Sequence, residues 1–140
     1  IIKNSKISKN WITEVFLKLY KKYKIKKVSL IGLSYKKNNS SLKNSPSINF
    51  LKTIRRLNIK VDLYDDLIKE YNGKDISEIQ NVIKNPEVVI FARDFKNSDL
   101  IIKKLFNNNT KLKFCIDPFN LVKDQYTNNF KTKVFQIGKN

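Results

Sequence analysis

The chain has 140 residues, 41% hydrophobic and 29% charged, which is typical of one globular domain and excludes a disordered chain. No apolar run approaches the ~20 residues that span a membrane, and no signal peptide is visible at the start. The single cysteine, Cys115, excludes an internal disulfide and favours a reducing, cytoplasmic location.

Helix-like and strand-like apolar patterns alternate along the chain. Residues 9–23 repeat apolar side chains at helical spacing and predict an amphipathic helix. The apolar run Val28–Leu33 predicts a buried strand. A second helix is expected after Ser45 as N-cap, with Pro46 in the first helical position, and residues 61–64 predict the next strand.

The second half of the chain continues this alternation. Asp75, with Glu78 three residues later, resembles a capping box and predicts the start of a third helix. Strands alternating with helices imply right-handed crossovers and a parallel sheet. The sequence therefore predicts an α/β fold, a Rossmann-like three-layer domain with a mostly parallel sheet of about five strands. Its remaining elements are expected at 87–92, 99–106, 113–116 and 133–137.

The connection after the first predicted strand is the expected place for a ligand. Residues 34–44 form a loop about twice the usual length, rich in lysine and short polar side chains, and the loop leads into a helix N-terminus. Such a helix end favours a phosphate or carboxylate, so we expect an anion site there, although a solvated loop stays open. Gly32 is the only glycine at this point, and the three-glycine dinucleotide fingerprint is therefore missing.

The same region resembles the C-terminal domain of the UDP-glucose/GDP-mannose dehydrogenase family. Its segment KKVSLIGLSYKKNNSSLKNSP is similar to the family pattern G-L-[AS]-[FY]-K-x-x-T-D-D-x-R-x-S-P. Further segments resemble family patterns in the same order: VDLYDD, NPEVVIFARDFKN, KFCIDPFN and VFQIGKN. The residues that match the first pattern in register are Gly32, Leu33, Ser34, Tyr35, Lys36, Ser45 and Pro46.

This resemblance implies a part of a nucleotide-sugar 6-dehydrogenase. Residues 1–24 would be the end of a helix from a central dimerisation domain, and residues 25–140 the UDP-binding domain. The family oxidises the primary alcohol of a UDP-sugar to a carboxylate with NAD, which an N-terminal domain outside this segment binds. The expected partners are a UDP-sugar, the rest of a parent chain and a second copy paired through the central domain. The start at Ile1 rather than Met also favours a fragment.

The resemblance assigns substrate contacts to Tyr35 and Lys36, the aromatic–lysine pair after the first strand, and to Lys43 in place of a family arginine. Neither the NAD site nor the catalytic cysteine maps onto this segment; Cys115 is expected in a core strand. Several family residues are replaced: Thr-Asp-Asp by Asn39, Ser40 and Ser41, an arginine by Phe119, and a tryptophan by Asp94 or Phe95.

Two alternatives remain beside this interpretation. One is a diverged, non-catalytic binding module that has kept the fold and lost the UDP site, which the replacements above would favour. The other is a nucleic-acid binder, suggested by the formal net charge of +17. We do not expect a nucleic acid partner, because lysine is spread over every segment and the RNA-recognition and zinc-finger signatures are missing.

Overall fold

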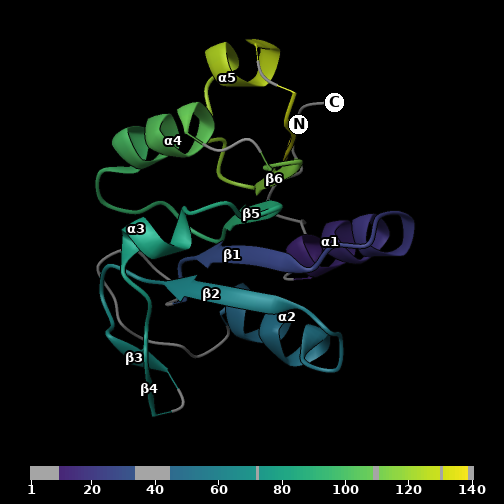
Figure 1. Ribbon diagram of the computed structural model, residues 1–140, viewed down its shortest axis with the longest axis vertical. Coiled ribbons are helices and arrows are strands. Elements are labelled where there is room, and N and C mark those ends of the chain that lie inside the picture. The colour runs from purple at the N-terminus through teal and green to yellow at the C-terminus, as the bar shows by residue number, and fades with distance from the viewer. Residues whose placement is uncertain (1–9, 34–44, 72, 109–110, 130, 139–140) are drawn as a thin grey trace.

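A computed structural model describes residues 10–33, 45–71, 73–108, 111–129 and 131–138. Helices and strands alternate along these residues (Figure 1). In chain order they are α1 Trp11–Lys22, β1 Lys27–Ile31, α2 Pro46–Ile54, β2 Lys60–Tyr64, β3 Glu70–Tyr71, β4 Lys74–Asp75, α3 Ile79–Val82, β5 Val88–Phe91, α4 Ser98–Asn107, β6 Phe114–Asp117, α5 Asp124–Asn129 and β7 Lys133–Gln136.

The longer strands form one parallel sheet of five, in the order β2-β1-β5-β6-β7. In this order β1 lies between β2 and β5. Its Leu30 pairs with Leu63 of β2 on one side and with Ile90 of β5 on the other. The strands β3 and β4 form a separate antiparallel pair. A parallel sheet with helical connections confirms the predicted Rossmann-like α/β fold.

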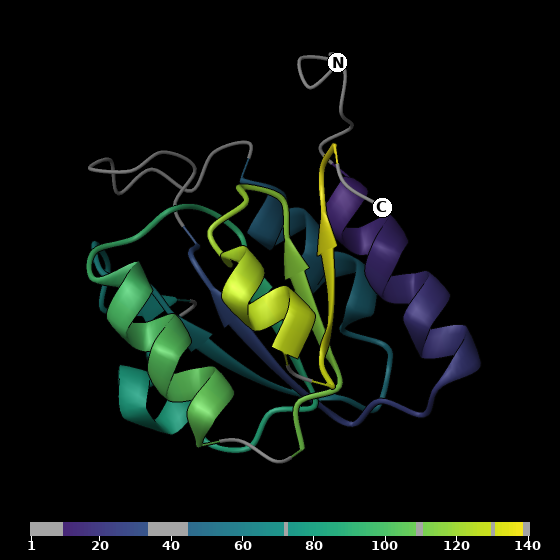
Figure 2. The same cartoon turned by 90° about the horizontal axis from the view of Figure 1, so that it is seen from above.

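Helices cover both faces of this sheet, which confirms the three predicted layers. On one face, Leu30 packs in a cluster with Phe16 of α1 and Phe50 of α2. On the other face, Phe91 of β5 packs in a second cluster with Leu105 of α4. Figure 2 shows α1 and α2 on one side of the sheet and α4 and α5 on the other. The alternation of side chains along each buried strand supplies both cores.

The start of α2 agrees with its predicted cap. The hydroxyl of Ser45 accepts a hydrogen bond from the backbone N–H of Ser47 at 3.2 Å, and Pro46 occupies the first helical turn. This bond satisfies one of the N–H groups that a helix start leaves without an intrahelical partner. The predicted helix at residues 9–23 is confirmed as α1, whose buried side chains include Ile12 and Phe16.

The prediction of a helix starting at Asp75 is wrong. Asp75 lies in β4 and pairs with Glu70 of β3 across a turn that contains Gly73 at φ +76°. The helix α3 begins only at Ile79, and Glu78 precedes it without a side-chain capping bond. Pairing of β3 with β4 therefore prevails over the capping-box pattern, and the left-handed backbone of Gly73 permits the turn between them. The helix α5 was not predicted, because only Tyr126 interrupts its polar sequence.

Gly32 ends β1 in a conformation that other residues avoid. Its φ is +103°, and a Cβ added there would lie 3.0 Å from Cγ of Arg93 and 3.2 Å from the backbone nitrogen of Arg93. The predicted strand Val28–Leu33 accordingly stops at Ile31, although Leu33 is still fully buried. Gly73 also has a positive φ, of +76°, but an added Cβ would meet nothing within 4 Å.

This contrast predicts different effects of alanine at the two glycines. Gly32→Ala should lower the free energy of unfolding by about 3 kcal/mol, because backbone strain and the contact with Arg93 add. Gly73→Ala should lower it by only about 1 kcal/mol, the effect of left-handed backbone alone. Urea unfolding of both variants measures the difference. Equal losses would contradict the close contact at Gly32.

Glu87 holds the amino ends of three strands together. Its carboxylate accepts hydrogen bonds from the backbone N–H groups of Lys26 at 2.8 Å and Lys27 at 3.1 Å, and it lies 3.6 Å from Nζ of Lys113. Burial by itself raises the pKa of Glu87, but the two backbone N–H groups and Lys113 together outweigh it. The net result is a pKa below the ordinary value of 4.5.

A lowered pKa in the folded state makes stability depend on pH at this residue. The ionised carboxylate stabilises the fold above its unfolded pKa, and this contribution is lost as the pH falls through the folded pKa. Glu87→Gln should therefore lower the free energy of unfolding by about 1 kcal/mol at pH 7. The difference from wild type should shrink below about pH 4.

Chemical denaturation between pH 3 and pH 7 measures this difference. The matched control is Glu78→Gln, because exposed Glu78 makes no capping bond at the start of α3. A pH-independent difference at Glu87 would show that the charge of its carboxylate contributes nothing.

Candidate functional site

The order of the parallel strands defines a switch point between β1 and β5. From β1 the chain crosses to β2 on one side, and from β5 it crosses to β6 on the other. In open α/β sheets, ligands bind beyond the carboxyl ends of the strands at such a point. The described segments that leave this edge are Gly32–Leu33 after β1, Asp65–Ile68 after β2 and Ala92–Asn97 after β5.

The start of α2 is tied to the end of β1 at this edge. The hydroxyl of Ser45 donates to the carbonyl of Leu33 at 2.5 Å, and the hydroxyl of Ser47 donates to the carbonyl of Gly32. The chain therefore leaves the described part at Leu33 and re-enters it at Ser45 beside the same strand end. The positive end of the dipole of α2 lies at that place and favours an anion, although Pro46 has no N–H and the N–H of Ser47 already donates to Ser45.

The carboxylate of Asp65 accepts hydrogen bonds from four described residues at this edge. One oxygen accepts from the backbone N–H of Leu33 at 2.6 Å. The other accepts from the N–H groups of Leu67 at 2.7 Å and Ile68 at 3.3 Å, and from Nη2 of Arg93 at 2.9 Å. The side chain of Asp65 is fully buried, so these donors supply the solvation that water would otherwise give its charge.

Arg93 connects this carboxylate to a second one. Its Nη2 also donates to Asp66, and its Nη1 donates to the carbonyl of Asp94 at 2.7 Å. The other oxygen of Asp66 accepts from the backbone N–H of Lys96 at 3.1 Å. We refer to Asp65, Asp66 and Arg93 as the ion cluster. Arg93 is only 2% exposed, so the ion cluster lies largely buried at the switch point.

The carboxylates leave a negative field beside the arginine. The pKa of Tyr64 is raised by burial and by the charges of Asp66 and Asp65, while Arg93 acts in the opposite direction. No group of three His, Cys, Asp or Glu side chains in the described ranges could hold a metal ion. The cluster is held together by ion pairs of Arg93 with Asp65 and Asp66.

The edge does not suit the pyrophosphate of NAD. In a dinucleotide-binding turn, glycines leave room for the cofactor to approach the backbone. At Gly32 that room is filled by Cγ of Arg93, which lies 3.0 Å from the position of an added Cβ. The residues present therefore do not fit NAD at this strand end.

The predicted substrate contacts Tyr35, Lys36 and Lys43 lie outside the described residues, as do the replaced positions Asn39, Ser40 and Ser41. The structure gives the segment that contains them its two anchors, Leu33 and Ser45, which a 2.5 Å hydrogen bond joins. Tyr35, Lys36 and Lys43 stay predictions.

The described replacements have different environments. Phe119 is 50% exposed in the turn after β6, where Asp117 accepts from the N–H groups of Leu121 and Val122. Phe95 is buried and its ring stacks on Phe91 with centroids 5.8 Å apart. Phe95 therefore belongs to the core, whereas half of the Phe119 side chain faces solvent.

Sequence reasoning missed the ion cluster. The only signal was composition, since Arg93 is one of three arginines in a chain whose other basic residues are all lysine. Cys115 is confirmed as a core strand residue of β6. Burial, followed by the charge of Asp117, raises the pKa of its thiol well above the ordinary value, which disfavours a thiolate nucleophile.

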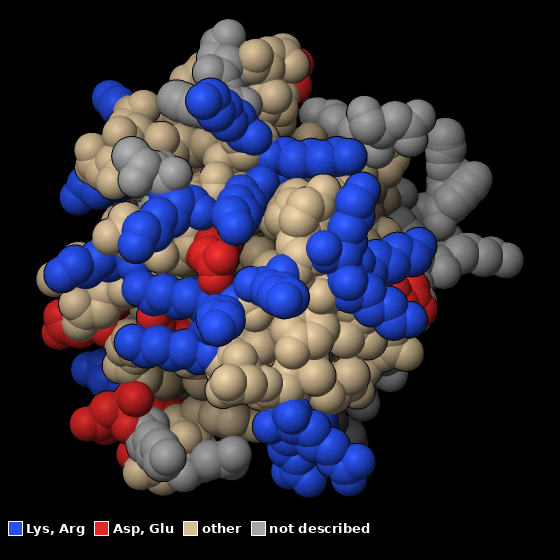
Figure 3. Space-filling model, turned by 45° about the vertical axis from the view of Figure 1, so that its right-hand side comes forward, with Lys and Arg blue, Asp and Glu red and all other residues tan. Residues whose placement is uncertain are grey.

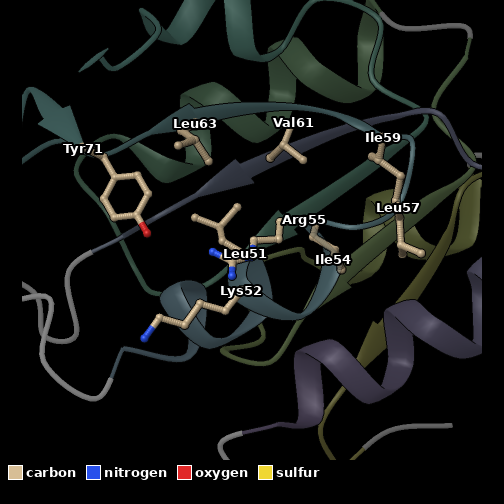
Figure 4. A pocket seen from close by; sticks show the side chains of 9 residues that line it. All are labelled: Leu51, Lys52, Ile54, Arg55, Leu57, Ile59, Val61, Leu63 and Tyr71. Atoms are coloured by element: carbon tan, nitrogen blue, oxygen red, sulfur yellow. The ribbon is translucent and has the colours of Figure 1, made fainter. Parts of the chain in front are cut away.

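A groove lies away from the switch point, between α2 and β2 (Figure 4). The side chains of Val61 and Leu63 point from β2 toward α2, and Tyr71 closes one end. Six of its nine lining residues are aliphatic, and the switch point, where the strand order reverses, is the better candidate for a nucleotide. This groove has a volume of about 260 Å³ and is lined by Leu51, Lys52, Ile54, Arg55, Leu57, Ile59, Val61, Leu63 and Tyr71.

Basic side chains are confined neither to the switch point nor to the groove between α2 and β2. Figure 3 shows lysine and arginine distributed over much of one face, with few acidic side chains between them. This agrees with lysines spread along the whole sequence. None of the described helices is long and apolar enough to cross a membrane.

Solved structures share this fold. The chain is similar to the UDP-N-acetyl-mannosamine dehydrogenase of Staphylococcus aureus, with a TM-score of 0.67 and 22% identity over 91% of this chain and 29% of that one. It is also similar to the UDP-D-ManNAc dehydrogenase of Pyrococcus horikoshii, with a TM-score of 0.60 and 22% identity over 88% of this chain and 28% of that one. The chain thus spans less than a third of either enzyme.

A comparison of the sequence with models of protein families identifies the family. No curated protein matches the chain significantly. The sequence model of the UDP-glucose/GDP-mannose dehydrogenase family, UDP binding domain, matches residues 29–124, from β1 to the start of α5. This range contains the switch point, the ion cluster and the segment between Leu33 and Ser45. The chain therefore belongs to the UDP-glucose/GDP-mannose dehydrogenase family and carries its UDP binding domain.

Proposed function

We propose that this domain binds the UDP group of a UDP-sugar at the switch point between β1 and β5. The observation that carries the proposal is the bond between Ser45 and the carbonyl of Leu33. It holds the N-terminus of α2, the positive end of the helix dipole, against the end of β1 at the edge where α/β sheets bind ligands. The family match over residues 29–124 supports UDP as the anion.

In this proposal the segment between the two anchors supplies the specific contacts. Lys36 donates to a phosphate or to the carboxylate that forms on the sugar, and Tyr35 lines the site. Lys43, close to the start of α2, adds a second positive charge near the phosphates. A lysine offers one point charge where a family arginine would offer two parallel donors.

The proposed activity is that of a larger enzyme. The domain presents the UDP-sugar, and other parts of a parent chain oxidise the primary alcohol of the sugar to a carboxylate with NAD as the oxidant. UDP-N-acetyl-mannosamine is a candidate substrate, since two proteins with this fold are named for it. A cytoplasmic location and a homodimer formed outside this domain belong to the same proposal.

Calorimetric titration of the 140-residue chain with UDP tests the proposal. Wild type should bind UDP saturably, and UDP at 100 times its dissociation constant should stabilise the fold by about 2.7 kcal/mol. Lys36→Ala should bind UDP at least about tenfold more weakly, because a charge-assisted hydrogen bond to the anion is lost.

The matched control is Lys60→Ala. Lys60 is an exposed lysine at the start of β2, on the opposite edge of the sheet, so its loss removes the same net charge. An equal loss of affinity in both variants would attribute binding to net charge instead of a site. No binding of UDP by wild type at millimolar concentration would favour the diverged module without a UDP site.

A further inference from the structure

The ion cluster at the switch point presents a difficulty for an anionic ligand. Asp65 and Asp66 carry two negative charges at the edge where the proposed diphosphate binds, and Arg93 is the cation that faces both. Two charges a few ångströms apart interact strongly where water is excluded. A phosphate near unpaired carboxylates would therefore be repelled.

Arg93 meets both carboxylates with one nitrogen. Its Nη2 lies 2.9 Å from Oδ1 of Asp65 and also bonds to Oδ1 of Asp66, while Nη1 is held by the carbonyl of Asp94 at 2.7 Å. The side chain of Arg93 is 3% exposed, and those of Asp65 and Asp66 are 0% and 14% exposed. The guanidinium thus reaches the two carboxylates through Nη2 and the carbonyl of Asp94 through Nη1, two positions that the single nitrogen of a lysine ammonium cannot occupy together.

The second oxygen of each carboxylate reaches a backbone N–H at the same edge. For Asp65 the donor is Leu33 at 2.6 Å, the last described residue before the segment with Tyr35 and Lys36. For Asp66 the donor is Lys96 at 3.1 Å. The guanidinium is therefore connected, through one carboxylate on each side, to the segments that follow β1 and β5.

The raised pKa of Tyr64 supports this electrostatic picture. After burial, its causes are the charges of Asp66 and Asp65, and Arg93 opposes them. The arginine thus offsets the field of the aspartates at a neighbouring side chain. A ligand phosphate at the same edge would meet the same balance of charges.

We propose that Arg93 is a positioning residue for the nucleotide, which fixes Leu33 through Asp65 and offsets the charge of Asp65 and Asp66 so that a diphosphate can bind. This inference rests on the proposed function and adds to it a residue outside the predicted set. It gives Arg93 two separable effects. The geometric effect acts on any ligand that binds at this edge, and the electrostatic effect acts on the phosphates alone.

The test compares UDP and uridine binding by calorimetry in the wild-type chain, Arg93→Lys and Arg93→Gln. Arg93→Lys keeps the positive charge and loses the planar guanidinium with its two donor nitrogens, so both ligands should bind about tenfold more weakly. Arg93→Gln also removes the positive charge that pairs with the two carboxylates, so UDP should lose about tenfold more affinity than uridine. This additional loss should decrease as salt is raised.

Leu105→Ala is the control for a purely structural effect. Leu105 is fully buried in α4 and belongs to the core on one face of the sheet, so its truncation destabilises the fold without touching the ion cluster. All titrations are made at a temperature where circular dichroism shows each variant folded. The control should bind both ligands as wild type does.

Each outcome decides the inference. UDP binding by Arg93→Lys as tight as by wild type overturns it, and so does an equal loss of affinity in Leu105→Ala. If Arg93→Gln does not fold, Arg93→Lys still tests whether the guanidinium is required. Failure of the wild-type chain to bind UDP would overturn the proposed function together with this inference, whereas an effect missing from the variants alone overturns only the role of Arg93.

Discussion

The buried carboxylate of Asp65 is the constraint on which the carboxyl edge depends. Its donors come from Leu33 after β1, Leu67 after β2 and Arg93 after β5. A buried carboxylate that loses its partners is destabilised by several kcal/mol, so no single segment can move away without that penalty. The strand order makes this coupling possible, since β1 lies between β2 and β5 and three adjacent strands end together.

Gly32 and Arg93 depend on each other in the same way. The missing Cβ of Gly32 leaves room for Cγ of Arg93, and the arginine fills the space that a dinucleotide-binding turn keeps for a pyrophosphate. One fold can therefore end its first strand with glycine for two different reasons. Here the glycine admits a protein side chain.

Much of the fold could be predicted because its elements carry strong local signals. The apolar run of β5 and the cap at Ser45 gave the right elements within a residue or two. The helix expected at Asp75 failed because a glycine turn and strand pairing overrode a weak capping pattern. Arg93 was missed because its partners, Asp65 and Asp66, lie 28 and 27 residues away in the sequence, and only the sheet order brings them together.

The net charge of +17 and the ion cluster act on an anionic ligand over different distances. Lysines distributed over the surface raise the local concentration of anions, but their field is screened beyond about 8 Å at physiological salt. Buried charges such as Asp65 and Arg93 are screened far less, so their balance decides what the edge accepts at contact distance. Distributed lysines cannot distinguish UDP from another anion. In the proposed site, selection therefore falls to the segment between Leu33 and Ser45, which the ion cluster and the Ser45 hydroxyl hold at its two ends.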